Sequence, residues 1–471
     1  MSTRSPAPTP DRDRQIVIFC PFVGWPLHFI TDLEIIQRHL AAGDNVTVLV
    51  CDGELSACDV NIHHHARDCL ACIATRSTGL ELLSGSLTVK PLYGFAPKEI
   101  SSFPLSTDFS SVAQLKRYRV DGFDIGDAAM SSLVRHLRDA DFDLAEHSGL
   151  LQALLRTAYD VFASVSEYLR TNVVDRFYVF NSRFASTRGA MRACQRQGVE
   201  CMVHERGCDI QHFHLYPNTF PHDREFVDAD IRRHWHAAAN PNNAELIATA
   251  WYRNKAVGIE GHLNSFVTGQ HADLLPERWS AAERNIVIFT SSEDEFVAVG
   301  EGWENPLYAS ELEGVRAIVR SLRDVTHELR IWVRVHPNLT GIENRQTRGL
   351  RELNAPFLTV IPADSPVSTY AMLRNSEKVL TFGSTIGIEA VFWRVPSILA
   401  GMSFYRDMGG TYNPTSHVEL MELLNASLVP KESDAALRYG YYQASFGIPF
   451  EYAEATGFIK GTFKGKGFDF W

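Results

Sequence analysis

The sequence predicts an α/β fold of two Rossmann-like, doubly wound domains that face a central cleft. Short apolar runs rich in β-branched residues alternate with segments of helical period in both halves of the chain. The alternation starts afresh near residue 285, which separates a second domain from the first. The strand-like runs are almost continuously apolar, as expected for parallel sheets covered by helices on both faces.

The first half opens with a βαβ pattern. Apolar runs at residues 15–20 and 45–50 flank a helical segment at 28–42, which ends before Gly43. Residues 90–108 show no period and predict an irregular insertion, and residues 223–262 are polar and helix-like. The remaining predicted elements are helices at 125–137, 150–169 and 183–196 and strands at 177–180 and 200–203.

The second half repeats the alternation more regularly. Strands are predicted at 285–290, 329–335, 357–361, 378–382 and 396–400, and helices at 312–322, 368–374, 386–392, 418–425 and 433–446. The domain organisation follows: a disordered arm at 1–14, an N-terminal domain at 15–265 with a Cys-rich insertion at 51–72, a linker at 266–284, a C-terminal domain at 285–445 and a tail at 446–471.

Composition excludes some classes of function. The 471 residues carry a net charge of −11, which argues against a nucleic-acid partner because no excess of cations displaces phosphate counterions. The first residues lack the apolar core of a signal peptide, and no apolar run approaches the roughly 20 residues that span a bilayer. We therefore expect a cytoplasmic protein, with peripheral contact at the inner face of the cytoplasmic membrane as the alternative.

Three polar loops follow strands of the second domain, where open α/β sheets bind ligands. Small and hydroxyl residues at a helix start suit a phosphate, a nearby acid suits ribose hydroxyls, and His or Arg suits an anion. A Ser-Thr pair before a helix is also a common N-cap, and that interpretation stays open for each loop alone. The predicted donor-binding residues are Ser291, Ser292, Arg334, His336, Ser384, Thr385 and Glu389.

The run from Ser368 to Ala390, with Val335-His336-Pro337 upstream and Val395-Pro396 downstream, resembles the C-terminal domain of GT-B-fold glycosyltransferases. It is most similar to the capsule-polysaccharide and surface-carbohydrate biosynthesis group, which includes Kdo transferases. The resemblance covers about residues 285–445. It implies that His336, Ser384, Thr385 and Glu389 contact the donor nucleotide, and that the chain end packs back onto the N-terminal domain.

The same resemblance implies that the N-terminal domain holds the acceptor and the general base. Polar residues follow two predicted strands of this domain, so their side chains are expected at the cleft. Glu205 and His204, with Asp209 behind them, are the candidate catalytic bases. A structural Arg–Glu pair is the alternative. The expected acceptor and cleft residues are Gly24, His28, Asn181, Arg183 and Arg206, although Gly24 equally serves a turn.

Four cysteines, Cys51, Cys58, Cys69 and Cys72, fall within one short segment and end in a C-x2-C spacing. This spacing predicts a structural zinc site or an iron–sulfur cluster. Free buried thiols are the alternative.

The function predicted is therefore glycosyl transfer from a nucleotide-sugar donor to a glycan or lipid-linked acceptor of a surface polysaccharide. We expect the transfer itself to need no metal, because the Asp-x-Asp triplets lie in polar stretches away from strand ends. Two alternatives remain: a nucleotide-sugar epimerase or hydrolase on the same fold, and a non-catalytic scaffold of polysaccharide assembly.

Overall fold

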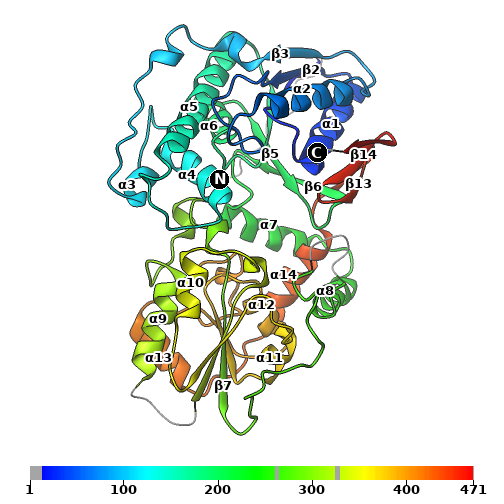
Figure 1. The fold of residues 1–471 in the computed structure, drawn as a ribbon. Helices are drawn as coiled ribbons and strands as arrows, with labels where there is room; N and C mark the ends of the chain where they lie inside the picture. The colour runs from blue at the N-terminus through cyan, green and yellow to red at the C-terminus, as the bar shows by residue number, and fades with distance from the viewer. Residues whose placement is uncertain (1–12, 260–264, 324–328, 470–471) are drawn as a thin grey trace, which may run out of the picture.

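The computed structural model describes residues 13–259, 265–323 and 329–469 and contains two α/β domains, one above the other in Figure 1. The predicted arm lies almost wholly outside the described residues. The N-terminal sheet has strand order β12-β6-β5-β4-β1-β2-β3, and the C-terminal sheet has order β11-β10-β7-β8-β9. Both orders are those of doubly wound sheets, so the predicted pair of Rossmann-like domains is confirmed.

The N-terminal sheet has a parallel centre and an antiparallel edge. Its parallel strands are β1 (Gln15–Cys20), β2 (Asn45–Val50), β3 (Thr88–Pro91), β4 (Arg176–Phe180) and β5 (Cys201–Arg206). The edge is formed by β6 (His212–Pro217), which runs antiparallel to β5, and by the short β12 (Ile448–Pro449), which runs antiparallel to β6.

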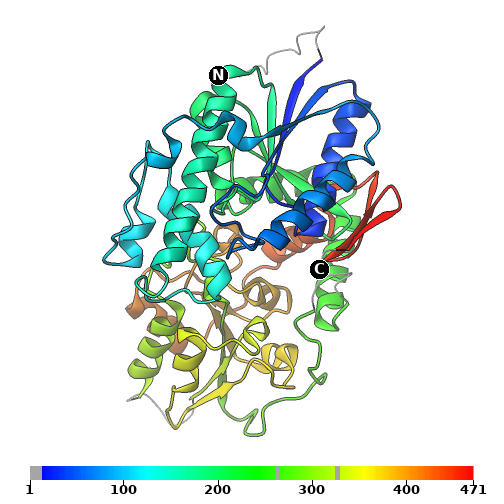
Figure 2. The same cartoon turned by 45° about the horizontal axis from the view of Figure 1, so that its top comes forward.

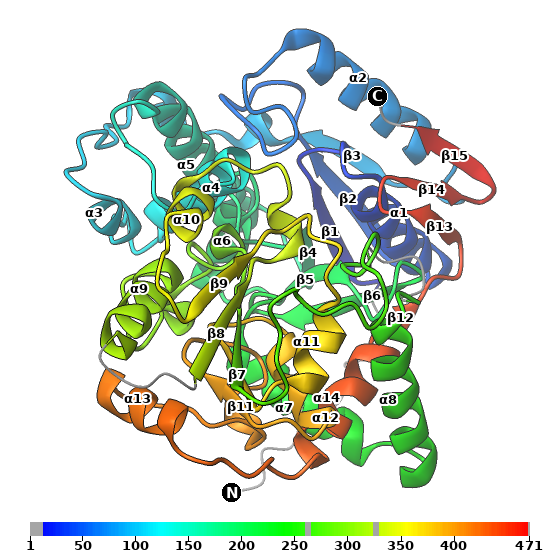
Figure 3. The same cartoon turned by 60° about the horizontal axis from the view of Figure 1, so that its bottom comes forward.

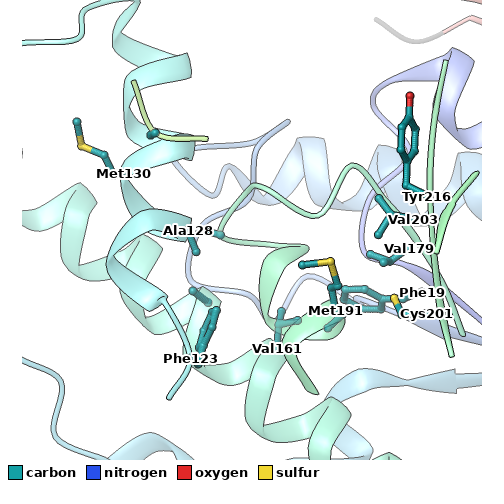
Figure 4. Packing of buried hydrophobic residues seen from close by; sticks show 14 of the residues in the cluster. Phe19, Phe123, Ala128, Met130, Val161, Val179, Met191, Cys201, Val203 and Tyr216 are labelled. Carbon is teal, nitrogen blue, oxygen red and sulfur yellow. The ribbon is translucent and has the colours of Figure 1, made fainter. Parts of the chain in front are cut away.

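Alternate residues of β1 supply two separate cores, because successive side chains of a strand point to opposite faces. Ile16 and Ile18 pack in the core of helix α1 (Pro26–Ala41). Val17 and Phe19 belong to the core that includes α4 (Ile125–Leu137), α5 (Ser148–Thr171) and α6 (Arg188–Gln197). Figure 4 shows this second core, in which Phe19 lies close to Met191.

The C-terminal sheet is wholly parallel and comprises β7 (Arg284–Phe289), β8 (Leu329–Arg334), β9 (Leu358–Ile361), β10 (Lys378–Thr381) and β11 (Ser397–Leu399). One face packs against α9 (Glu311–Leu322), α10 (Arg345–Arg351) and α13 (His417–Asn425). The other packs against α11 (Thr369–Asn375) and α12 (Ile386–Phe392), as Figure 3 shows from below. The strand order reverses between β7 and β10, where such sheets bind ligands.

The chain end returns to the N-terminal domain. Helix α14 (Asp434–Ser445) packs on α7 (Arg224–His236) and α8 (Pro241–Ala256). The chain then adds β12 to the first sheet and forms a small sheet of β13 (Ala453–Gly457), β14 (Lys460–Phe463) and β15 (Lys466–Asp469) beside α1, red in Figures 1 and 2. The carboxylate of Glu34 in α1 accepts hydrogen bonds from the backbone N–H groups of Glu451, Tyr452 and Ala453 at 2.9, 2.8 and 3.0 Å.

Some local predictions were wrong. The Cys-rich segment overlaps the start of helix α2 (Ala66–Leu80), which was not predicted. Residues 90–108 are irregular as predicted, apart from the end of β3 and two short 3-10 helices, and α3 (Val112–Lys116) follows them. Helix α6 starts five residues after its predicted first residue because Asn181 and Ser182 form a left-handed turn, with φ of 53° and 62°. Short 3-10 helices occupy Leu92–Phe95, Ile100–Ser102, Glu293–Glu295, Glu301–Trp303, Pro337–Leu339 and Arg406–Met408. Among the described residues, no helix is both long enough and apolar enough to cross a membrane.

Candidate active site

Five of the predicted donor residues meet in one pocket at the carboxyl edge of the C-terminal sheet. Arg334 and His336 follow β8, and Ser384, Thr385 and Glu389 lie in or beyond the loop after β10. The pocket has a volume of 60 Å³. It shares Lys255 and Thr385 with a cleft of 680 Å³ between the domains, and Phe266 and Pro337 with a groove of 860 Å³. A ligand can therefore extend from the small pocket in two directions.

His336 is positioned as a neutral hydrogen-bond donor. Its Nδ1 accepts from the backbone N–H of Asn338 at 3.1 Å, so the ring hydrogen of the neutral form lies on Nε2. Its backbone N–H donates to Thr290 Oγ1 at 2.9 Å. Burial, together with the positive charges of Lys255 and Arg334, lowers the pKa of His336 to about 4. Near neutral pH the ring can therefore donate to an anion without carrying a charge.

Lys255 is a site residue that sequence reasoning missed. It lies on α8, in the polar stretch before the linker, and its Nζ lies 3.0 Å from Glu389 Oε1 and 3.3 Å from Thr385 Oγ1. A basic residue in the last turn of a helix carries no signal for a ligand site on its own. Only the fold brings this cation to the pocket.

Glu389 lies on the floor of the pocket and is 2% exposed. Its carboxylate accepts from the Tyr370 hydroxyl and from Thr385 Oγ1, the latter at 3.1 Å, in addition to its ion pair with Lys255. The expected role of Glu389 as an acceptor for ribose hydroxyls therefore competes with three protein partners. In this arrangement Glu389 holds Lys255 over the pocket.

Arg334 and Ser384 shape the pocket in different ways. Arg334 is 1% exposed and donates to the backbone oxygens of Pro362 and Ser365, so it fixes the loop after β9. Burial lowers the pKa of Arg334 to about 10, which leaves it cationic at neutral pH. The Ser384 carbonyl accepts from the Tyr405 hydroxyl at 2.5 Å, which fixes the backbone of the loop after β10.

Ser291 and Ser292 lie outside this pocket. Ser291 lines a separate 620 Å³ pocket with Glu293 and Glu311, and its backbone N–H donates to the two Glu311 oxygens at 3.1 and 2.9 Å. Ser292 Oγ accepts from Asn338 Nδ2 at 3.4 Å. The loop after β7 thus places Ser291 beside α9 and Ser292 beside Asn338, whereas Thr290 lines the 60 Å³ pocket.

Glu205 is one of two predicted bases, with Asp209, that the structure places in the interdomain cleft. It accepts hydrogen bonds from Asn181 Nδ2 at 2.5 Å and from the Arg206 backbone N–H at 3.0 Å, and His28 Nε2 lies 3.7 Å away. Burial opposes ionisation, but His28 and these two hydrogen bonds outweigh it and lower the pKa of Glu205. Burial lowers the pKa of His28 to about 4, so His28 carries no charge at neutral pH. At that pH the two hydrogen bonds stabilise the Glu205 carboxylate.

His204 does not reach the cleft, contrary to the prediction. It is fully buried, and its Nε2 lies 2.8 Å from Asp32 Oδ1 on α1. The physical reason is the two-residue period of a strand, which sends the side chains of His204 and Glu205 to opposite faces of β5. Asp209 does line the cleft, in the turn after β5, where its Oδ1 lies 2.6 Å from His212 Nδ1.

Three of the five expected acceptor residues line the interdomain cleft, and the other two do not. Asn181, Arg183 and Arg206 line the interdomain cleft, and Arg183 donates to the Glu295 carbonyl of the other domain at 3.0 Å. His28 contacts the cleft through Glu205. Gly24 serves packing: a Cβ there would lie 2.9 Å from Val60 Cβ.

The four clustered cysteines are neighbours but are not arranged as the ligands of one ion. Cys51 contributes to the raised pKa values of Cys58, Cys69 and Cys72, for each of which burial is the main cause. Within the described chain, no three of these thiols come within 4.8 Å of one another. Helix α2 separates them: Cys69 and Cys72 lie on it, whereas Cys51 and Cys58 lie in the preceding loop. As placed, the thiols do not fit a zinc ion or an iron–sulfur cluster, and either cofactor stays a prediction from the sequence.

Comparisons with solved structures found distant likenesses. Two are the Thermosulfurimonas dismutans KpsC β-Kdo 2,4 transferase (12% identity, TM-score 0.38, 57% of this chain and 79% of that chain) and β-Kdo 2,7 transferase (15%, 0.36, 59% and 79%). A third is the Methanocaldococcus jannaschii UDP-GlcNAc 2-epimerase (12%, 0.27, 90% and 98%). A search of curated proteins found no match.

A family model gives the more direct result. The model described as capsule polysaccharide biosynthesis protein matches residues 250–449. The matched stretch begins on α8, five residues before Lys255, and includes the whole C-terminal sheet and α14. It therefore contains the pocket formed by Lys255, His336, Ser384 and Glu389. Residues 250–449 are therefore similar to the capsule polysaccharide biosynthesis proteins, the group that the sequence resembles.

Proposed function

We propose that this protein is a glycosyltransferase that moves a sugar from a nucleotide-sugar donor to a surface-polysaccharide acceptor. One observation carries the proposal: Lys255 and Thr385 of the small C-terminal pocket line the same 680 Å³ cleft as Glu205 of the N-terminal domain. Lys255, which can bind an anion, and the Glu205 carboxylate, which can accept a proton, therefore face the same cleft.

The small pocket suits the phosphate next to the sugar. Its 60 Å³ is far below the roughly 300–1,000 Å³ of pockets that hold whole ligands, so the rest of the donor must extend beyond it. Lys255 supplies a positive charge, and His336 Nε2–H and the Ser384 hydroxyl supply uncharged donors. Such preorganised groups stabilise the charge that develops on a leaving phosphate.

The two adjoining spaces suit the two ends of the donor. The sugar extends into the interdomain cleft, toward Glu205, and the nucleoside extends into the groove lined by residues 265–270 and 363–365. In the reaction, the Glu205 carboxylate takes the proton of the acceptor hydroxyl while that oxygen attacks the sugar carbon and the bond to the phosphate breaks. The ionised state of Glu205 that this requires agrees with its lowered pKa.

The first test is thermal stabilisation of the protein by CMP, CDP, UDP and GDP. A ligand present at about 100 times its Kd stabilises a protein by about 2.7 kcal/mol, which a melting curve resolves. We expect one nucleotide to stabilise the wild type, and the Ser384→Ala and His336→Ala variants to lose most of that effect. His271→Ala, an exposed histidine outside the pocket, is the matched control.

A second measurement separates transfer from the alternatives. The sugar form of the nucleotide that binds is incubated with and without an acceptor glycan. A transferase consumes the donor quickly only with acceptor, whereas an epimerase converts it without acceptor and a scaffold does neither. If no nucleotide stabilises the folded protein at millimolar concentration, the proposal fails.

A further inference from the structure

The turn between β5 and β6 brings three metal-binding side chains together. Cys208 Sγ, a carboxylate oxygen of Asp209 and a ring nitrogen of His212 all lie within 4.8 Å of one another. In the part of the chain that the structure describes, no other set of three His, Cys, Asp or Glu side chains is gathered in this way. None of the three belongs to the Cys-rich segment of the sequence.

The turn is tight at its base. The backbone N–H of Gly207 donates to the His212 carbonyl at 2.7 Å, and a Cβ on Gly207 would lie 2.7 Å from His212 Cβ. Glycine is therefore needed for the close approach that carries His212 back toward Cys208 and Asp209.

The end of the chain holds the turn from outside. The backbone N–H of Cys208 donates to the Phe446 carbonyl at 2.9 Å, and the Gln211 carbonyl accepts from the Phe450 N–H at 3.0 Å. The Gln211 side chain donates to the Ala455 carbonyl at 2.5 Å. These three hydrogen bonds fix the turn before any ion arrives, so binding requires less further ordering of the chain.

The ligand set selects the class of ion. A thiolate, an imidazole and a carboxylate suit Zn²⁺, whereas Mg²⁺ and Ca²⁺ prefer oxygen ligands alone. Zinc bond lengths of about 2.0–2.3 Å in a tetrahedron place neighbouring ligand atoms roughly 3.3–3.8 Å apart. Asp209 Oδ1 and His212 Nδ1 are already 2.6 Å apart, so side-chain rotations of small extent open the space for an ion.

We propose that Cys208, Asp209 and His212 form a zinc site at the edge of the interdomain cleft. On binding, the Cys208 thiol releases its proton to solvent, and the His212 hydrogen lies on Nε2 so that Nδ1 binds the ion. Three protein ligands leave one position for water or another oxygen. Cys208 and Asp209 line the same cleft as Glu205, so the ion lies on the acceptor side of the cleft. The site is independent of the proposed transfer reaction.

The test is metal binding by the full chain, prepared without metal. Zn²⁺ is titrated against a chromophoric chelator, and Co²⁺ is titrated separately because its absorption bands report thiolate ligation and tetrahedral geometry. We expect one equivalent of either ion to bind, with a thiolate–Co²⁺ band. Cys208→Ser and His212→Ala should each weaken Zn²⁺ binding at least tenfold and abolish or shift the Co²⁺ spectrum.

Two controls keep the result specific. His236→Ala removes an exposed histidine elsewhere, and Cys69→Ser removes a thiol of the Cys-rich segment, so both should bind as the wild type does. Thermal melting of each metal-free variant verifies that it is folded. The proposal is overturned if the folded wild type binds no zinc, if Cys208→Ser binds normally, or if Cys69→Ser loses the ion.

Discussion

Lys255 Nζ lies 3.0 Å from Glu389 Oε1, so a cation from α8 is fixed over the pocket by an acid on the floor of that pocket. Lys255→Met removes the positive charge that we assign to the donor phosphate and leaves the buried Glu389 without its ion pair. We expect the transfer rate to fall at least tenfold and the stabilisation by nucleotide to shrink, because charge-assisted contacts contribute about 1.5–3 kcal/mol.

Lys460→Met, at an exposed position of β14, is the matched control and should leave both quantities unchanged. Steady-state kinetics and melting curves measure the two effects. A Lys255→Met variant that binds nucleotide and transfers sugar like the wild type would remove Lys255 from the site.

Glu205→Gln should abolish proton acceptance while keeping nearly the same shape. We expect kcat to fall by about 10²- to 10⁴-fold, the usual contribution of a general base. Nucleotide binding should persist, because the donor pocket lies on the other domain. Full activity of the glutamine variant would contradict the assignment.

The pH profile gives an independent measure of Glu205. Its pKa lies below the ordinary value of 4.5, so the carboxylate is ionised throughout the neutral range. We expect the acid limb that Glu205 causes in kcat/KM to lie below pH 4.5, with a flat profile from about pH 6 to 7. An acid limb centred near neutral pH would show that a different group is the base.

Most strands and helices were predictable because each has a local signal. The apolar run of β1 and the helix Ile386–Phe392 were predicted at their observed bounds. Helix α2 was missed because its cysteines suggested a metal knuckle, and β6 was missed because it alternates histidine with apolar residues after a polar turn. Pairing with β5 and β12 stabilises β6, and no local pattern reveals β12, a partner far along the chain.

The residues of the site were predictable only where they directly follow a parallel strand. His336, Ser384 and Thr385 reached one pocket because parallel strands end at one edge of their sheet. The direction in which each side chain points was harder to predict: His204 and Glu205 both lie on β5, but His204 points into the core. Lys255 could not be found this way, because its place depends on the packing of α8 against α14, which joins segments far apart in the chain.

Two half-buried histidines should make stability fall in mild acid. His28 and His336 have pKa values of about 4 in the folded protein, below the ordinary value of 6.5 expected in the unfolded chain. Between these values the unfolded chain binds protons that the folded protein does not, so stability falls as pH decreases from 6.5 toward 4.

His336→Asn removes one of these groups. The free energy of unfolding, measured with denaturant between pH 6 and 4.5, should fall less steeply with decreasing pH in this variant. Its slope should be smaller than that of the wild type by up to about 1.4 kcal/mol per pH unit. His236→Asn, at an exposed site, should keep the slope of the wild type. Equal slopes in His336→Asn and wild type would mean that His336 is protonated in the folded protein.

Arg138 joins the two domains from an unfavourable backbone conformation. It ends α4 in the left-handed region with φ of 53°, its Nε lies 2.5 Å from the buried Asp294 Oδ2, and its carbonyl accepts from Asn344 Nδ2 at 2.7 Å. Arg138→Ala removes the ion pair but keeps the strained backbone, so we expect a loss of about 1–3 kcal/mol in the free energy of unfolding.

Arg138→Gly removes the same ion pair and also relieves the left-handed strain, which costs a non-glycine residue roughly 1–2 kcal/mol. The glycine variant should therefore unfold at a higher denaturant concentration than the alanine variant, with both below the wild type. Arg320→Ala, on the exposed side of α9, is the control and should change little. If the glycine variant is instead less stable than the alanine variant, the entropy that glycine gains in the unfolded chain outweighs the strain at this position. If Arg138→Ala matches the wild type, the contact with Asp294 does not stabilise the junction of the domains.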